Sequence, residues 1–194
     1  MSKFPNCILT AALLLGSVVA GHSDELPASK QTRLGLYVTA TQAGDMVADP
    51  DVLFVDIRSR AEVAFLGIPK DVDVHIPYMV MPMMASFNED KGTYSLELNP
   101  DFPTDFQRYA EKNGITEDTQ IILMCRSGSR SARAADLLAD MGYTKVYSLV
   151  DGYEGDKATE GPGKGQRVVN GWRNAGLAWS YKETLDQVYP TDLN

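Results

Sequence analysis

The sequence is poor in the residues that build cysteine-rich folds and metal sites. It has two cysteines, Cys7 and Cys125, and two histidines, His22 and His75, among 194 residues. Two cysteines exclude a disulfide scaffold, and so few cysteines and histidines exclude a clustered zinc or iron–sulfur site. Two histidines also leave few candidates for the histidine of a Ser-His-Asp triad. We therefore expect no metal and no cofactor.

Positive charge is also scarce. The chain carries 18 lysines and arginines against 26 aspartates and glutamates, which gives a net charge of -8. A nucleic-acid partner requires a basic surface, so the balance argues against one. Hydrophobic residues make up 44% and charged residues 23%, as in ordinary globular proteins. The length and composition predict one folded domain with a modest extension.

No apolar run is long enough to span a membrane comfortably. The longest lies between Cys7 and Ala20, follows Lys3, and ends before a polar segment. A charged start, a short apolar stretch and the small residues Val18 and Ala20 are typical of a secretory signal peptide. We therefore predict a signal peptide over residues 1–20, a periplasmic or secreted protein, and no stable membrane anchor. An uncleaved anchor or a buried helix is the alternative.

Strand and helix patterns alternate along the remaining chain. This alternation predicts an α/β fold with a mainly parallel sheet and helices on both faces. We expect a flexible leader over 21–33, the domain over 34–182, and a C-terminal tail over 183–194. Residues 78–101 show no clear period and are expected to form a long connection. Strands are predicted at 34–38, 52–57, 72–76, 119–124 and 145–150, and helices at 40–48, 60–66, 102–113 and 130–141.

The most informative segment begins at Cys125. A buried strand ends there, a loop rich in small residues follows, and a helix is predicted to start near Arg130. Such loops point backbone N–H groups inward at a helix N-terminus and form a cradle for anions. A thiol beside Arg126 and Arg130 is expected to exist largely as the thiolate. The alternative is an inert cysteine at a strand end, which leaves the two arginines unexplained.

These residues resemble the rhodanese-like sulfurtransferases over the stretch from Thr39 to Trp179. The loop that follows a buried strand and begins with cysteine is one shared feature. Asp56 and Arg58 match an Asp-x-Arg signature, while Gly67-Ile-Pro69 and His75-Ile-Pro77 are altered forms of two further motifs. The remaining matches are Gly152-Tyr-Glu-Gly155 and Gly171-Trp-Arg-Asn-Ala-Gly-Leu177.

The resemblance implies a three-layer fold with a five-stranded sheet and a role for each residue of the loop. Cys125 would accept sulfane sulfur as a persulfide, from thiosulfate or a persulfide donor, and pass it to cyanide or a thiol, including a protein thiol. Asp56 and Arg58 would support the end of the sheet. The persulfide would be held by the loop residues Arg126, Ser127, Gly128, Ser129, Arg130 and Ser131.

The sequence also departs from the family pattern. Thiosulfate-cleaving members resemble one another in placing a cation where this chain has Ser127, and often an arginine where it has Glu62. Arg126 and Arg130 remain as anion partners. A Gly-rich insert over 156–170 is expected to be a mobile surface loop, or else a flap that supplies Lys164 or Arg167 to an anionic donor.

Two other functions stay open. One is a cysteine-dependent phosphatase or arsenate reductase, although its Cys-x5-Arg pattern would require arginine at Ser131. The other is a non-catalytic carrier of persulfide or a binding module. His75 is interpreted as structural. The methionine cluster is expected to provide apolar packing or a docking surface, with Cu(I) binding as the alternative; its members are Met79, Met81, Met83 and Met84.

Overall fold

The computed structural model describes residues 26–193 and has an α/β architecture built on a five-stranded parallel sheet. The predicted signal peptide and Cys7 lie outside the described residues. The strand order is β1-β10-β9-β2-β4, with all neighbours parallel. The sheet strands are β1 (Tyr37–Val38), β2 (Val52–Asp56), β4 (Val74–His75), β9 (Gln120–Met124) and β10 (Val146–Leu149).

Two central strands, β2 and β9, are the best-covered part of the sheet. They run side by side in a register that pairs Leu53 with Ile121 and Val55 with Leu123. Every residue of β2 is buried, as expected for a continuous apolar run covered on both faces. Successive side chains point to opposite faces, so each strand supplies both core layers.

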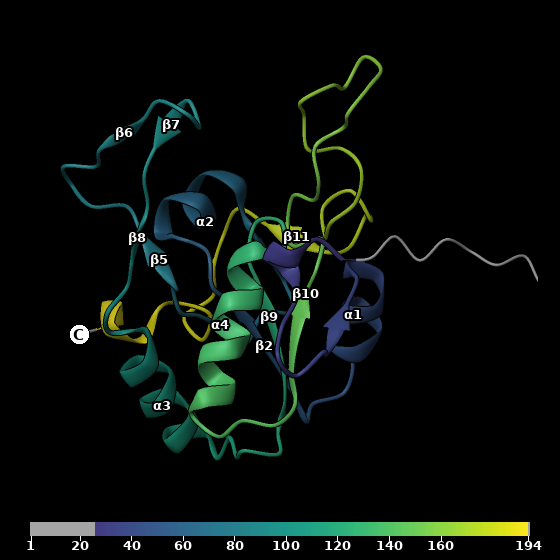
Figure 1. Ribbon diagram of the computed structural model, residues 1–194. Coiled ribbons are helices and arrows are strands. Elements are labelled where there is room, and N and C mark those ends of the chain that lie inside the picture. Colours follow the sequence, from purple (N-terminus) through teal and green to yellow (C-terminus); the bar gives the residue numbers. More distant parts are fainter. Residues whose placement is uncertain (1–25, 194) are drawn as a thin grey trace, which may run out of the picture.

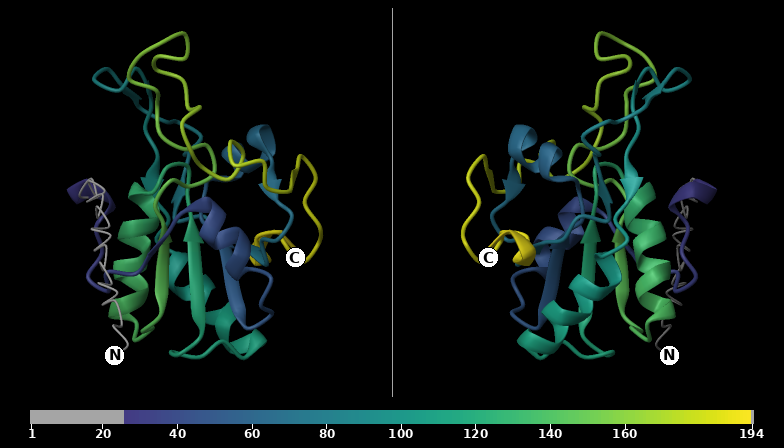
Figure 2. Two further views of the ribbon diagram at one scale, coloured as in Figure 1. Left: turned by 90° about the vertical axis from the view of Figure 1, so that its right-hand side faces the viewer. Right: turned by 90° about the vertical axis from the view of Figure 1, so that its left-hand side faces the viewer.

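Helices cover both faces of the sheet, which gives three layers (Figures 1 and 2). Phe102 and Phe106 from α3 and Leu138 from α4 pack with one core layer. Ala43 from α1 and Val63 from α2 pack with the other. The predicted fold class is therefore confirmed. The helices are α1 (Ala40–Met46), α2 (Arg60–Leu66), α3 (Phe102–Asn113) and α4 (Ser129–Asp140).

The predicted helices match the structure because their ends carry clear sequence signals. Thr39 and Ser59 begin α1 and α2 with capping boxes, in which each hydroxyl accepts the backbone N–H three residues on. Gly114 ends α3 in the left-handed conformation at φ 69°. Two helices differ slightly from the prediction: α1 ends two residues early, at Met46, and α4 is shifted by one residue, to Ser129–Asp140.

The segment expected to be a long connection is a two-part β arm over residues 79–98. Its inner pair is β5 (Met79–Val80) with β8 (Glu97–Leu98), and its outer pair is β6 (Phe87–Asn88) with β7 (Thr93–Tyr94), both antiparallel. The rings of Phe87 and Tyr94 meet edge to face, with centroids 5.7 Å apart. The arm rises from the sheet, away from α3 (Figure 1).

The expected flexible leader is packed wherever the structure describes it. Residues 28–30 form the short 3-10 helix η1 (Ala28–Lys30), which lies against α4. The Lys30 ammonium reaches Asp156 at 2.8 Å, and Arg33 binds Asp140 at 2.7 Å. Tertiary ion pairs thus connect residues 26–33 to the insert and to α4, although the local sequence of this segment is merely polar.

The C-terminal segment is also packed, although it was expected to be a tail. The Gln187 amide is buried and donates to the backbone carbonyls of Pro69 and Val72. Tyr189 is buried and donates to the Asp105 carboxylate. The described residues end with the 3-10 helix η2 (Pro190–Leu193). One buried amide that satisfies several loop carbonyls fixes this segment, and no periodic pattern signals it.

Two further segments complete the molecule. Strand β3 (Ile68–Pro69) pairs antiparallel with β11 (Trp179–Ser180), which ties the residues after α2 to the C-terminal part of the domain. The insert over 156–170 leaves the carboxyl end of the sheet, and the two views of Figure 2 show it and the β arm rising from this same end. No helix among residues 26–193 is long and apolar enough to cross a membrane.

Candidate functional site

Cys125 lies directly after β9, at the carboxyl end of the central sheet. Its side chain is buried, and its Sγ accepts a hydrogen bond from the Gly128 N–H at 3.1 Å. The Ser131 Oγ is 3.6 Å from the sulfur and donates to the Gly128 carbonyl at 2.8 Å. The sulfur therefore lies against its own loop, between the Gly128 N–H and the Ser131 hydroxyl.

The loop can take this shape only with glycine at position 128. Gly128 has φ 97°, and a Cβ there would lie 2.1 Å from the Val150 carbonyl oxygen. Gly152, on the facing turn after β10, has φ 62°, and a Cβ would meet the Cys125 carbonyl oxygen at 2.6 Å. Backbone thus packs directly on backbone around the cysteine.

The first turn of α4 supplies the amides of the predicted cradle. Ser129, Arg130 and Ser131 occupy this turn, where backbone N–H groups have no partner within the helix. The first helical hydrogen bond that we observe runs from the Ala132 N–H to the Gly128 carbonyl. The positive end of the helix dipole therefore faces the segment that begins at Cys125.

Cys125 opens onto a pocket of about 580 Å³. The walls of this pocket come from four segments that are far apart in the sequence. The α4 loop forms one part, α2 supplies Glu62 and Phe65, and the β arm supplies Met81 and Tyr94. The insert contributes Arg167. The pocket thus lies between the two projections at the carboxyl end of the sheet.

Arg130 does not offer a free charge to this pocket. Its two terminal nitrogens bind both oxygens of Glu62, at 2.7 and 2.5 Å. Burial works to raise the pKa of Glu62, but Arg130 and the Ser59 hydrogen bonds outweigh it and hold that pKa at about 2. Burial likewise works to lower the pKa of Arg130, and Glu62 raises it overall. Arg130 was predicted from the sequence to bind an anion. In the structure its charge is paired with the carboxylate of Glu62.

Arg126 is also paired. Its Nε donates to the Glu154 carboxylate, while about half of the Arg126 side chain remains exposed. Glu154 lies in the turn after β10, in the Gly-Tyr-Glu-Gly segment. Both arginines of the loop therefore carry carboxylate partners from other parts of the chain.

Asp56 and Arg58 form a buried ion pair that lies apart from the pocket walls. Arg58 Nε donates to Asp56 Oδ1 at 2.9 Å, and an Arg58 terminal nitrogen donates to the Gly67 carbonyl at 2.7 Å. The guanidinium lies 3.9 Å from the centroid of the Tyr153 ring. His75 Nε2 lies 2.7 Å from the Arg58 carbonyl oxygen. These contacts tie β2, α2 and β4 together, the arrangement expected of supporting residues.

The methionine cluster is split by the fold. Met79 packs on the edge of the core, whereas Met83 and Met84 are 99% and 88% exposed. Apolar packing therefore accounts for Met79 alone. No group of three or more His, Cys, Asp or Glu side chains that could hold a metal occurs among the described residues.

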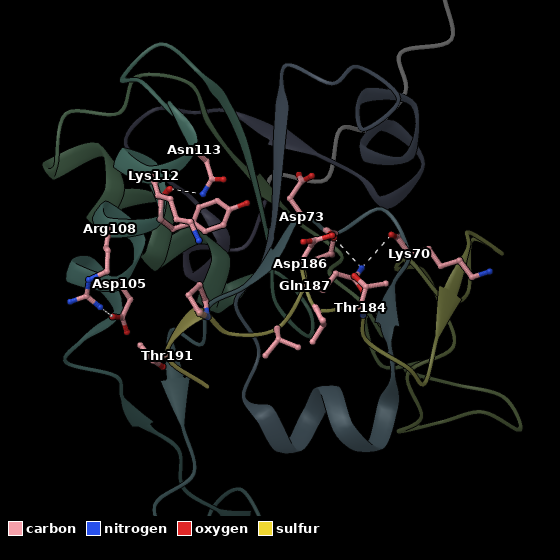
Figure 3. Close-up of a pocket in the computed structure, with 15 residues that line it drawn as sticks. Lys70, Asp73, Asp105, Arg108, Lys112, Asn113, Thr184, Asp186, Gln187 and Thr191 are labelled. Atoms are coloured by element: carbon pink, nitrogen blue, oxygen red, sulfur yellow. Dashed lines mark hydrogen bonds and ion pairs between the residues drawn. The ribbon is translucent and has the colours of Figure 1, made fainter. Parts of the chain in front are cut away.

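A second pocket, of about 620 Å³, shares no wall residue with the one at Cys125. It lies between α3 and the C-terminal segment (Figure 3). The Arg108 and Asp105 side chains pair across 3.1 Å at its edge, and Gln187 is occupied by backbone carbonyls. With no thiol in its walls, it offers no nucleophile for sulfur chemistry.

Sequence reasoning missed the carboxylates that partner the loop arginines. A capping box that spans Ser59 to Glu62 could have been found, since the spacing is a known helix signal. The bond from Glu62 to Arg130 joins residues 68 apart, and that from Glu154 to Arg126 joins residues 28 apart. Neither pairing leaves a local pattern in the sequence.

Comparison with known proteins agrees with this geometry. The sequence-family model of the rhodanese-like domain matches residues 39–159. An uncharacterized protein of Rickettsia prowazekii is 29% identical over 146 residues, which cover 74% of this chain and 96% of that protein. The crystal structure of Rv0390 from M. tuberculosis is 30% identical with a TM-score of 0.52, and the match covers 75% of this chain and 96% of that one.

Two relatives carry names that state an activity. The thiosulfate sulfurtransferase GlpE of Tolumonas auensis is 35% identical over 104 residues, which cover 53% of this chain and 87% of that protein. A tRNA uridine(34) hydroxylase of Nitrobacter hamburgensis is 29% identical over 127 residues, which cover 65% of this chain but only 41% of the hydroxylase. With the three-layer fold and the matched segment from 39 to 159, these similarities show that the chain belongs to the rhodanese-like domain family.

Proposed function

We propose that this chain is a sulfurtransferase that carries sulfane sulfur as a persulfide on Cys125. The observation that carries the proposal is the position of the sulfur. The sulfur accepts a hydrogen bond from the Gly128 N–H at 3.1 Å and lies beside the N-terminal turn of α4, and Cys125 is one of the residues that line a pocket of about 580 Å³. Such donors stabilise a thiolate, and they equally stabilise the terminal negative charge of a persulfide.

The proposed cycle has two displacements. The Cys125 thiolate attacks the outer sulfur of thiosulfate, an S–S bond to the protein forms, and sulfite leaves with the electron pair of the bond that breaks. A thiophilic acceptor such as cyanide then attacks the terminal sulfur, forms thiocyanate and restores the thiolate. Neither step needs an external oxidant. A persulfide donor would react in the same way and release a thiolate.

The experiment that tests this function measures thiocyanate formation from thiosulfate and cyanide. Wild-type protein should turn over, and Cys125→Ser should show no activity above background, because a serine hydroxyl does not accept sulfur. The substitution is nearly isosteric, so circular dichroism and the thermal midpoint should stay close to wild type. Turnover that survives in Cys125→Ser would overturn the proposal.

A comparison of the wild type with Cys125→Ser also distinguishes sulfur transfer from phosphate-ester hydrolysis. The loop between Cys125 and the start of α4 is short, and Ser131 stands where a phosphatase would carry its arginine. Arg130, one residue earlier, is held by Glu62. We expect no hydrolysis of an aryl phosphate and no inhibition by vanadate. Hydrolysis that is lost in Cys125→Ser would assign the cysteine to phosphate esters instead.

We also propose that the protein is exported, on the strength of the charged and apolar N-terminal run over residues 1–20. N-terminal sequencing of protein recovered from a periplasmic or culture fraction tests this. The expected mature chain begins at Gly21. A chain that retains Met1 and stays in the cytoplasmic fraction would contradict export.

A further inference from the structure

The carboxylates nearest the Cys125 pocket already have cationic partners. Glu62 binds Arg130, and Glu154 binds Arg126. At the base of the insert, Asp156 binds Lys30 with Nζ–Oδ1 at 2.8 Å. Any further cation that faces the pocket therefore adds a surplus positive charge.

Arg167 of the insert is such a cation. It lines the pocket together with Cys125 and makes no salt bridge within residues 26–193. One terminal nitrogen donates to the Gly155 carbonyl at 2.5 Å. Its Nε is buried and has no hydrogen-bond partner in the part of the chain that the structure describes. A buried donor without an acceptor is costly, so the group is suited to a ligand that supplies one.

The electrostatic surroundings of Arg167 point to an anion. Burial lowers the pKa of Arg167, and repulsion from Arg126 lowers it further. Negative charge on Glu154, Asp156 and Cys125 acts in the opposite direction and raises that pKa. Arg167 therefore lies within electrostatic reach of the sulfur. A bound anion would relieve its repulsion with Arg126.

The other cations at the pocket are less suited to this role. Lys91 and Arg133 also line it, but both side chains are exposed to water. Solvent screens such charges and reduces what they contribute to binding. Ser127, in the loop itself, is uncharged. Arg167 is the partly buried cation that lacks a carboxylate partner in the described chain.

The insert is built to hold Arg167 in place. At its base, the Asp156 N–H donates to Asn170 Oδ1 at 2.7 Å, and Asn170 Nδ2 donates to Asp156 Oδ2 at 3.1 Å. The Asn174 amide donates to the Arg167 carbonyl at 3.2 Å. The backbones of Lys157 and Arg167 form an antiparallel bridge. These bonds hold the backbone of Arg167, and the bond from its guanidinium to the Gly155 carbonyl orients the side chain.

We propose that Arg167, carried by the 156–170 insert, is the residue that binds the anionic end of the sulfur donor above Cys125. The inference rests on the proposed function and assigns its donor class: small anions with a charged oxygen-bearing end, such as the sulfonate of thiosulfate. Guanidinium donors match two oxygens of such a group. The outer sulfur then reacts with Cys125, and Arg167 releases the sulfite that leaves.

Alkylation of Cys125 tests this site without relying on sulfur transfer. Iodoacetate and iodoacetamide react by the same step, in which an S–C bond forms and iodide leaves, but only iodoacetate is an anion. In Arg167→Gln, the rate with iodoacetate should fall about tenfold relative to the rate with iodoacetamide, since one charge-assisted contact is lost. The ratio cancels any change in thiolate population, which affects both reagents equally.

Lys164→Gln is the matched control. It removes the same charge from the same insert, but Lys164 is exposed and does not line the pocket. This variant should keep the wild-type ratio, and Arg167→Lys should recover part of it. Thermal melting of each variant checks the fold. If both reagents slow equally in Arg167→Gln, or neither slows, Arg167 only holds the insert and the proposal is wrong.

Steady-state kinetics with thiosulfate then distinguish the proposed sulfurtransferase function from the proposed role of Arg167. In Arg167→Gln, KM for thiosulfate should rise about tenfold, with a smaller change in kcat. A wild-type protein whose alkylation ratio depends on Arg167, but which forms no persulfide and no thiocyanate, would keep the anion site and overturn the sulfurtransferase function. A change in kcat alone, with KM and the alkylation ratio unaltered, would instead overturn the role of Arg167.

Discussion

Among single residues, Glu62 links the fold to the site. It caps the start of α2 through Ser59 and clamps Arg130 at the start of α4. The Glu62 side chain is 17% exposed. Two helices on opposite faces of the sheet are thereby joined beside the thiol. An ion pair of this kind contributes to stability only while both charges are present.

This pairing predicts a pH dependence of stability. The pKa of Glu62 is about 2 in the folded protein, below its ordinary value of 4.5. The stabilisation is therefore complete above about pH 5 and is lost as the pH falls toward 2. Between pH 6 and pH 3 the loss from this group should be about 2 kcal/mol. Urea unfolding at the two pH values measures it.

Glu62→Gln isolates the contribution of this carboxylate from that of other acidic groups. The difference in unfolding free energy between wild type and Glu62→Gln should shrink by about 2 kcal/mol on going from pH 6 to pH 3. A difference that stays constant over this range would show that the carboxylate titrates normally, and that the clamp on Arg130 is weaker than its geometry indicates.

The second prediction for a single residue concerns the substitution of Gly128 by alanine. Alanine there would meet the Val150 carbonyl oxygen at 2.1 Å, in a backbone with φ 97°. Gly35 also has a positive φ, of 63°, but open space around it. Gly128→Ala should lower the thermal midpoint more than Gly35→Ala, and it should alter reactivity at Cys125. A positive φ is unfavourable for alanine at both positions, so the clash should account for most of the difference.

Equal destabilisation by the two alanine substitutions, with normal reactivity of Cys125 in Gly128→Ala, would contradict this account. It would mean that the loop can move away from Val150 at little cost. The thermal midpoint and the rate of thiol alkylation are read on the same samples, so packing and reactivity are compared directly.

Among the elements, those with strong local signals were predictable. Helices α2 and α3 were predicted with the bounds that the structure shows; Gly114 ends α3, and the capping box at the start of α2 is a further local signal of the same kind. Strands β2 and β9 were expected from their continuous apolar runs. The β arm was not predicted. Its strands are two residues long, and its exposed pairs show no alternation of buried and exposed side chains.

The segment over residues 26–33 gives an element-scale prediction. It was expected to be flexible, yet Lys30 and Arg33 bind carboxylates of the insert and of α4. A chain that begins at residue 34 should be less stable than one that begins at residue 26. The loss of the partly buried Lys30 contact alone should cost about 1 kcal/mol or more. Chemical unfolding of the two chains measures the difference.

Lys30→Gln in the longer chain serves as the control for this truncation. It removes the bond to Asp156 while it leaves the rest of the segment in place. Its effect should be part of the loss seen on truncation. If the chain that begins at residue 34 and the chain that begins at residue 26 unfold at the same denaturant concentration, residues 26–33 do not stabilise the fold. The expectation of a flexible leader would then stand.

At the scale of the whole molecule, an acidic chain gathers arginines, two of them paired with carboxylates, around a thiol. The net charge is -8, yet the walls of the Cys125 pocket include four arginines, Arg126, Arg130, Arg133 and Arg167. The sequence located the loop and the cysteine because the whole cradle is one continuous segment. Arg167 was only one of two candidates from the insert, because the insert, the arm and α2 line one pocket only in the folded chain.

The central claim is that Cys125 carries sulfur, and intact mass spectrometry tests it most directly. Wild-type protein incubated with thiosulfate, with an alkyl persulfide as the comparison, should gain the mass of one sulfur atom and lose it on addition of cyanide. Cys125→Ser should gain nothing. The account is contradicted if the wild-type chain gains no sulfur from either donor, or if the serine variant still gains it.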